Sequence, residues 1–118
     1  LRFENPNTFK VWEQAGIETD STLYYSDYPG FRTGSCYVHS LFNVLKQDHL
    51  SVTEQPLHIM DCCLEEMTSD QAIETIQKMK QEVKKHRGEF VFLVHNASYG
   101  WMHKNVNLQK VEQQLYEG

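Results

Sequence analysis

Cys36 is the residue of this chain best suited to nucleophilic chemistry. It stands where a helix is expected to begin, and the positive end of a helix dipole lowers the pKa of a thiol and favours the reactive thiolate. His95 or His103 could serve as its base, and Asn96 or Asn105 could orient the imidazole. This pattern predicts a thiol-peptidase site made of Cys36, His95 and Asn96. Free cysteine is among the most often buried residue types, however, so packing is the stronger interpretation of Cys36.

The other two cysteines, Cys62 and Cys63, are adjacent in the sequence. A disulfide needs Cα atoms about 4.4–6.8 Å apart, so neighbouring cysteines rarely bridge each other. An odd number of cysteines that includes such a pair indicates reduced thiols in the cytosol. The six histidines show no spacing typical of a zinc site. We therefore expect no metal and no cofactor.

The charge balance of the chain narrows the class of its partners. Its 118 residues include 11 Lys and Arg against 16 Asp and Glu, a net charge of −5 with His neutral. A general nucleic-acid binder would carry a basic face, so this balance excludes that class. The longest uncharged apolar run, 90–94, is far short of the roughly 20 residues of a membrane span. Residues 1–20 mix charges, a Pro and two Asn, unlike a signal peptide. The sequence therefore predicts a cytoplasmic protein that binds neither nucleic acid nor membrane.

The elements that would position the candidate residues alternate between strand and helix. Residues 1–16 contain turn formers and no sustained period, which predicts an extended lead-in. β-Branched and aromatic residues at 21–26 predict a strand that closes in a turn. Apolar residues at helical spacing then predict three successive helices, at 36–48, 57–67 and 70–86.

The run Phe90–Val94 is too short for a helix and predicts a strand buried on both faces. Leu108, Val111 and Leu115 indicate a final turn or two of helix. Two strands separated by so much helix would be parallel or non-adjacent members of one sheet. Because an isolated pair of strands is marginal in water, we expect this chain to complete a sheet whose other strands lie elsewhere.

Two motifs give the chain a family resemblance. Residues 18–31 (ETDSTLYYSDYPGF) place an acidic pair before a strand that ends near Tyr-Ser, and Pro-Gly-aromatic follows. Residues 34–41 (GSCYVHSL) are similar to a Gly-Ser-aromatic-Phe-Ile-x-x-Leu motif that opens the next helix. In this order the motifs resemble the small subunit of caspases, over residues 17–95. The resemblance implies an α/β, caspase-like three-layer unit at 17–118: the small-subunit half, with helices packed on a short, mainly parallel sheet.

The departures from that family concern its catalytic and substrate-binding residues. Caspases carry a Ser-Trp-Arg segment between the two motifs, and its Arg helps to bind the aspartate of the substrate. Only Arg32-Thr33 separates the motifs here, so the resemblance makes Arg32 a substrate-binding candidate on a shortened loop. A guanidinium recognises a carboxylate through a directional two-point fork, so its placement is decisive. The family's nucleophile and base belong to its large subunit, and their Gln-Ala-Cys and His-Gly motifs are missing from this sequence. The resemblance therefore implies no catalytic residue in this chain.

The resemblance also implies an interface. Small subunits of the family dimerise through their last strand, which would leave an edge prone to pairing. The counterpart here is the last predicted strand, formed by Phe90, Val91, Phe92, Leu93 and Val94.

A candidate processing site lies near the start of the chain. Residues 17–20 (IETD) are similar to a tetrapeptide that initiator caspases cleave after Asp, which makes Asp20 the residue preceding the cut. The competing interpretation is that Glu18 and Asp20 match the family's acidic pair at the edge of ordered structure, where a protease has poor access.

Together these observations predict a non-catalytic, pseudocaspase-like protein. It would associate with itself as a dimer, or with a caspase partner, through its last core strand, and would regulate cysteine-peptidase activation in a cell-death pathway. One alternative is the small subunit of a processed, Asp-specific cysteine endopeptidase whose large chain is a separate polypeptide. The other is a small papain-like thiol peptidase that uses Cys36 and His95.

Overall fold

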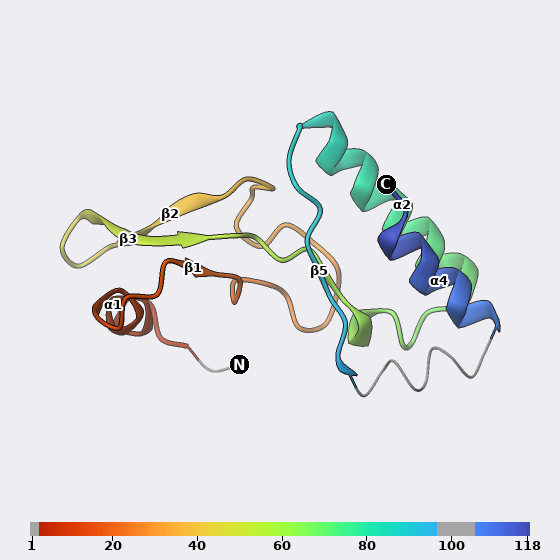
Figure 1. Ribbon diagram of the computed structural model, residues 1–118, viewed down its shortest axis with the longest axis horizontal. Coiled ribbons are helices and arrows are strands. Elements are labelled where there is room, and N and C mark those ends of the chain that lie inside the picture. Colours follow the sequence, from red (N-terminus) through yellow and green to blue (C-terminus); the bar gives the residue numbers. More distant parts are fainter. Residues whose placement is uncertain (1–2, 97–105) are drawn as a thin grey trace.

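The chain is mixed α/β and elongated, measuring 50 × 31 × 20 Å (Figure 1). The computed structural model describes residues 3–96 and 106–118. Along the chain its elements are α1 (Asn7–Gln14), β1 (Thr19–Asp20), β2 (His39–Asn43), β3 (Asp48–Glu54), β4 (Ile59–Met60), the 3-10 helix η1 (Asp61–Cys63), α2 (Ser69–Lys85), β5 (Phe92–Leu93) and α4 (Val106–Tyr116). A three-stranded sheet with α1 forms one end of the molecule, α2 and α4 form the other, and the pair β4–β5 lies between them.

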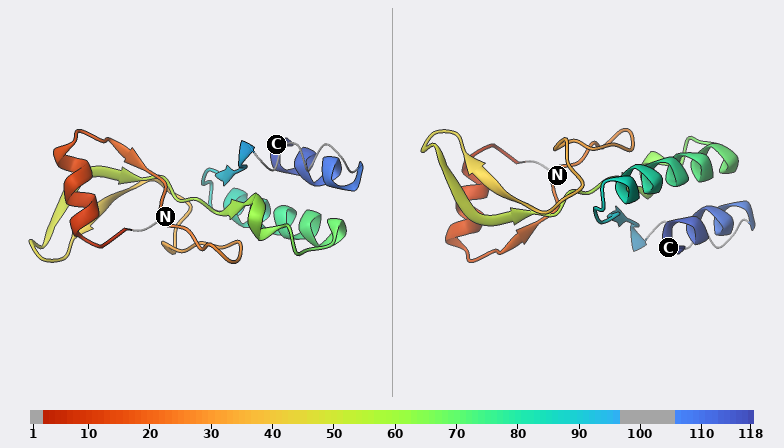
Figure 2. Two further views of the ribbon diagram at one scale, coloured as in Figure 1. Left: turned by 90° about the horizontal axis from the view of Figure 1, so that it is seen from below. Right: turned by 90° about the horizontal axis from the view of Figure 1, so that it is seen from above.

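The first element, α1, occupies the segment predicted to be an extended lead-in, so that prediction is wrong. Phe9 is buried under the sheet against Leu41 and Val52, and Trp12 packs beside it. Figure 2 shows the helix lying across one face of the strands. Phe9 and Trp12 are three residues apart, the spacing that places two side chains on one face of a helix. The stability gained by burying this short apolar face outweighs the preference of the preceding residues, 5–7, for a turn.

The sheet at this end has the strand order β1-β3-β2. β1 is parallel to β3, and β2 is antiparallel to it. In β3, buried Leu50, Val52 and Glu54 alternate with more exposed residues, the period of a strand with one face on a core. With β4–β5, the described part of the chain thus forms two small sheets, where a single short one was expected.

Residues 36–48, predicted as a helix, contain β2 and the turn into β3, so that prediction is also wrong. Leu41 and Asn43 are buried while the residues between and before them are exposed or half-buried. The Asn43 side chain accepts hydrogen bonds from the backbone N–H groups of Leu45 and Lys46, each 3.1 Å. Leu45, part of the supposed helical stripe, is 77% exposed. An Asn-closed turn therefore replaces the helix that the apolar spacing indicated.

The strand predicted at 21–26 is also wrong, because β1 ends at Asp20, before that segment begins. Asp20 Oδ2 accepts hydrogen bonds from the backbone N–H of Thr22 at 2.9 Å and from its hydroxyl at 2.6 Å. This local turn takes the chain away from the sheet.

A helix was predicted at 57–67, but the chain there forms β4 and then η1. Its first half bonds to β5: β4 pairs in parallel with β5, with Ile59 opposite Phe92 and Met60 opposite Leu93. Its second half makes the local bonds of η1 and the turn after it, from Leu64 N–H to Asp61 O and from Met67 N–H to Leu64 O. The predicted strand at 90–94 is thus confirmed in type but is shorter, and Leu93 is 38% exposed instead of buried.

Two helix predictions are confirmed. α2 begins at a capping box, in which the Thr68 hydroxyl accepts from Gln71 N–H and the Gln71 side chain accepts from Thr68 N–H. α4 packs along α2, and an apolar core lies between these two helices and the strand pair β4–β5. Its buried members are Ile59, Leu64, Ala72, Ile76, Val111 and Leu115. No helix among the described residues is long and apolar enough to cross a membrane.

His58 connects the loop that contains Phe31 to the segment that leads into β5. Its backbone N–H donates to Val91 O at 3.0 Å, and its ring Nδ1 accepts from Val91 N–H at 3.1 Å. Its ring lies between those of Phe31 and Phe90, with centroid separations of 5.0 and 6.1 Å. Burial lowers the pKa of His58, so its ring is held neutral in this stack.

Candidate functional site

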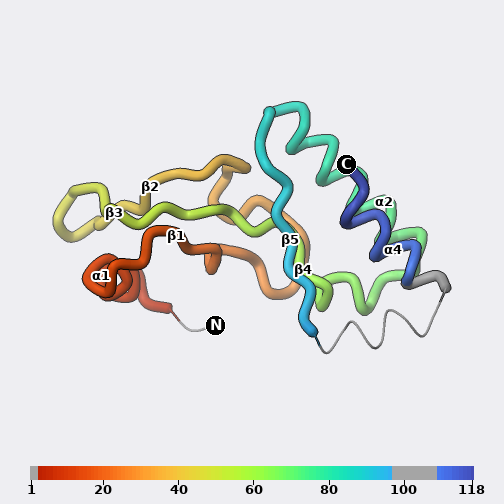
Figure 3. Tube along the Cα trace, viewed as in Figure 1, coloured from red at the N-terminus to blue at the C-terminus, as the bar shows by residue number. Residues whose placement is uncertain are grey.

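A histidine and an aspartate meet where the two parallel strands end. Asp61 directly follows β4, and His95 lies two residues after β5. Figure 3 shows these strands side by side near the centre of the molecule. Parallel strands end at the same edge of a sheet, and open α/β sheets bind their ligands at that carboxyl edge.

The aspartate holds the histidine at two points. Asp61 Oδ1 lies 2.7 Å from Nδ1 of the His95 ring, and Oδ2 accepts the backbone N–H of His95 at 2.8 Å. Oδ1 also accepts the backbone N–H of Cys62 at 2.9 Å. The Asp61 side chain is fully buried, whereas that of His95 is 51% exposed. The carboxylate is therefore fixed from several sides, and the imidazole is fixed by it.

This arrangement sets the chemistry of the imidazole. A carboxylate can only accept a hydrogen bond, so in the neutral ring Nδ1 carries the proton and Nε2 has the lone pair. His95 Nε2 has no partner among the described residues, and the ring is half exposed. A histidine with one nitrogen on a buried carboxylate and the other free is equipped to take up and release protons.

The sequence indicated His95 as a base but not the residue that orients it. Asn96, the predicted orienting residue, is exposed in the structure. The other candidates, His103 and Asn105, lie outside the described residues. Asp61 was missed because its role depends on the pairing of β4 with β5, across a separation of 34 residues. The only available signal was a polar residue directly after an apolar pair, Ile59-Met60.

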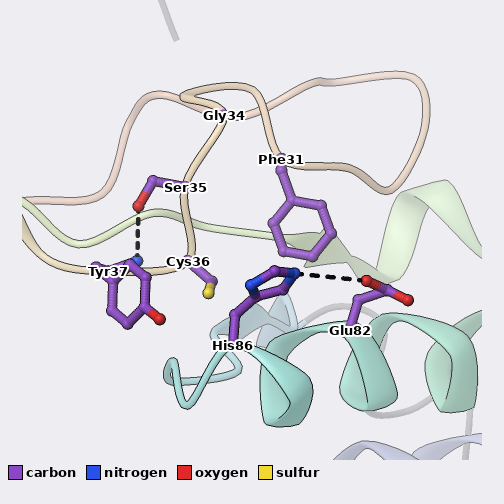
Figure 4. Close-up of a pocket in the computed structure, with 7 residues that line it drawn as sticks. All are labelled: Phe31, Gly34, Ser35, Cys36, Tyr37, Glu82 and His86. Carbon is purple, nitrogen blue, oxygen red and sulfur yellow. Dashed lines mark hydrogen bonds and ion pairs between the residues drawn. The ribbon is translucent and has the colours of Figure 1, made fainter.

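Cys36 lies elsewhere, in a bend before β2 and not at a helix N-terminus, so that part of the prediction is wrong. It is 5% exposed and lines a cavity of about 250 Å³ (Figure 4). Figure 4 shows its sulfur directed toward His86, whose Nε2 lies 3.8 Å from Glu82 Oε2. The histidine that lines this cavity is thus His86, whereas His95 is held by Asp61.

Arg32 is engaged within the chain. Its Nη1 donates to Tyr24 O at 2.6 Å, and its guanidinium lies over the Phe3 ring, 5.3 Å from the centroid. Its positive charge also lowers the pKa of Glu54, against the larger effect of burial. Arg32 nonetheless remains exposed, so its role as a substrate-binding residue stays a prediction.

Asp20, the predicted processing residue, belongs to β1. Its carbonyl accepts the backbone N–H of Gln55 at 2.7 Å, and it lies opposite Glu54 in the parallel pairing. A protease that cut after Asp20 would have to draw this strand out of the sheet. The geometry therefore favours the interpretation in which the acidic pair marks ordered structure.

The predicted interface residues fall on both sides of β5. Phe90, Phe92 and Val94 pack against the core formed by α2 and α4, and Val91 packs beside Leu57 on the opposite side. Leu93 is the exposed member. Among the described strands, β5 pairs with β4 alone.

Comparisons with protein-family models, with curated protein sequences and with solved structures find no match to this chain. Within residues 3–96 and 106–118, no three His, Cys, Asp or Glu side chains are grouped so as to hold a metal ion. The geometry of the Asp61–His95 pair is therefore the main guide to function.

Proposed function

We propose that His95 is the general acid–base of an enzyme site and that Asp61 is its positioning residue. The observation that carries this proposal is the contrast in exposure within the pair: a fully buried carboxylate holds a half-exposed imidazole at 2.7 Å. Burying a carboxylate is costly unless it is hydrogen-bonded, so such a pair is a constrained feature of the fold. His95 Nε2 would remove a proton from an attacking water or hydroxyl, or return one to a leaving group.

The position of the pair agrees with this role. It lies at the carboxyl edge of β4–β5, and a two-stranded sheet is marginal by itself. We infer that further strands, from another chain or from another part of a longer one, extend this sheet and supply the remainder of the site. The reaction class is hydrolysis or transfer of an acyl-type group, which needs one proton shuttle of this kind.

The test uses p-nitrophenyl acetate, an activated ester that an oriented imidazole can hydrolyse. His95→Ala should reduce the rate for the chain by at least roughly tenfold, within the effect expected of an acid–base residue. Asp61→Asn should also reduce it, because an amide no longer fixes the Nδ1–H tautomer. The matched control is His49→Ala, since His49 is exposed and its ring packs against that of Phe42, away from the Asp61–His95 pair. Equal rates in the His95 and His49 variants would overturn the proposal.

A second candidate function is association through β5. Among the described strands β5 is paired on one side alone, and this supports association, because the unpaired N–H and C=O groups of an edge strand can bind another chain. The proposed partner is a second copy of the chain or a caspase-type protein, as the motifs at 18–31 and 34–41 imply. The hairpin β2–β3 stands where that family resemblance implies a helix, so the three-layer small-subunit fold and the pseudocaspase role stay predictions.

Leu93 is the residue of β5 at which a substitution can test association. Phe92 contacts Tyr116 with ring centroids 5.1 Å apart and packs against the core, so a charge there would unfold the chain. Leu93 is 38% exposed and lies in the same strand. Leu93→Lys should convert a dimer to a monomer in sedimentation equilibrium while the circular dichroism spectrum is unchanged. Lys46→Glu, on the distant β2–β3 turn, is the charge-change control, and a dimer that survives Leu93→Lys would exclude this edge.

A further inference from the structure

The adjacent residues Cys62 and Cys63 form a pair of free thiols in η1. Cys62 is exposed, whereas Cys63 is 6% exposed. Both sulfur atoms approach one acceptor, the carbonyl oxygen of Ser26, at 4.0 Å from Cys62 and 3.6 Å from Cys63. The two thiols therefore point to the same side of the turn, although they belong to successive residues.

The surroundings of the pair restrict its chemistry. Burial raises the pKa of the Cys63 thiol, and the neighbouring Cys62 and the Asp27 carboxylate add to the rise. Burial and the nearby Asp27 carboxylate both disfavour negative charge beside Cys63, so an anionic reagent would bind poorly at this pair of thiols. A direct disulfide is also disfavoured, because neighbouring Cα atoms are closer together than a relaxed disulfide requires. A neutral reagent that places one atom between the two sulfurs avoids both costs.

We propose that Cys62 and Cys63 form a dithiol site that captures a neutral trivalent arsenical or a similar thiophilic compound. With an arsine oxide, each thiol replaces one bond of the As=O group, so two As–S bonds form. The two thiol protons leave with the oxygen as one water molecule, and arsenic stays trivalent. Two soft thiolate ligands suit such a thiophilic atom, and the second bond forms within the same molecule at a high effective concentration.

Capture at this site would also act on Asp61, the first residue of η1. Bridging the next two residues would constrain the turn that holds the carboxylate against His95. This consequence rests on the function proposed above, whereas capture itself does not.

The test is intact-mass analysis of the whole chain incubated with phenylarsine oxide and an excess of a monothiol. One phenylarsine per chain should be retained, and a dithiol such as 2,3-dimercaptopropanol should remove it. Cys62→Ser should weaken retention by roughly a hundredfold, because the chelate effect is lost. Cys36→Ser is the matched control and should retain the arsine.

Two further results keep the test decisive. Cys63 is buried, so its replacement can disturb the fold; the unmutated chain with Cys62 blocked by iodoacetamide serves instead and should not retain the arsine. Retention by that blocked chain, or by Cys62→Ser at full strength, would overturn the proposal, as would loss of retention in Cys36→Ser. Ester hydrolysis by the unmodified chain reports on the proposed function separately, so the two can fail independently.

Discussion

Among the glycines that the structure describes, Gly88 leaves the least room for a side chain. A Cβ atom at this position would lie 2.3 Å from Cys36 Sγ and 2.8 Å from the Cys36 carbonyl oxygen. The preceding residue, Arg87, takes the left-handed conformation with φ of 57°, and Gly88 N–H closes the end of α2 on Val83 O at 2.9 Å. The bend that carries Cys36 therefore packs directly on this glycine.

Gly88→Ala should lower the free energy of unfolding by roughly 2–3 kcal/mol, the upper part of the range for inserting an atom into a packed site. Urea unfolding followed by circular dichroism measures this. Gly34→Ala is the matched control: Gly34 has φ of +71° but nothing within 4 Å of its Cβ position. That change should cost about 1 kcal/mol, from backbone strain alone. Equal costs for the two variants would contradict the close contact with Cys36.

Single residues were predictable from the sequence only where their surroundings are local. His95 could be identified as a base because it follows an apolar run that ends a strand. Its true partner could not, because Asp61 reaches it only through the parallel pairing of strands separated by α2. His86 likewise reaches the bend of Cys36 through tertiary packing that no spacing in the sequence reveals.

At the scale of elements, α2 has the clearest start signal. The capping box between Thr68 and Gln71 satisfies N–H groups that a helix end would otherwise leave without partners. Asp70 in its first turn and Lys84 and Lys85 in its last complement the helix dipole.

Thr68→Ala should therefore lower the free energy of unfolding by about 1 kcal/mol. The measurement is again urea unfolding, with Ser69→Ala as the control, expected to change it by less than about 0.5 kcal/mol. In a double-mutant cycle with Gln71→Ala the two effects should not add, because both residues belong to one motif. Strict additivity would show that the box contributes nothing as a unit.

The elements differ in how well periodicity predicted them. Ile73, Ile76, Met79 and Val83 repeat over about three turns in α2, and such a long stripe has few alternatives. The stripe at 36–48 is shorter, and there a single Asn43 side chain closing a turn was enough to favour a hairpin. β4 was missed because its partner, β5, lies more than 30 residues away in the sequence and no local signal reveals the pairing.

At the scale of the whole molecule, two buried titratable groups change the stability of the fold with pH in opposite directions. Burial raises the pKa of Glu54 to about 8, and the adjacent Asp20 carboxylate adds to the rise. The folded chain therefore keeps a proton that the unfolded chain releases above about pH 4.5, so stability falls as pH rises from there to about 8. Burial instead lowers the pKa of His58. The unfolded chain takes up that proton below about pH 6.5, so stability also falls on acidification through that range.

We therefore expect the free energy of unfolding to be greatest at mildly acidic pH, between about 4.5 and 6.5. Glu54→Gln should remove the alkaline decline and stabilise the chain at pH 8 by up to about 5 kcal/mol, because the pKa rises from 4.5 to about 8 and each unit corresponds to about 1.4 kcal/mol. Urea unfolding of the unmutated chain and of Glu54→Gln, at pH 5 and at pH 8, measures the alkaline decline and its removal. The exposed Glu65→Gln is the control, and an alkaline decline that persisted in Glu54→Gln would show that another group causes it.

The placement of His58 between Phe31 and Phe90 affects how the molecule unfolds. The sheet with α1 and the pair α2–α4 have separate apolar cores, with a small third cluster around Leu57 between them. Structures of this kind open in cooperative units instead of all at once. The aromatic stack and the bonds of His58 to Val91 hold the loop that contains Phe31 against the segment that leads into β5, and protonation of this one imidazole would weaken that attachment.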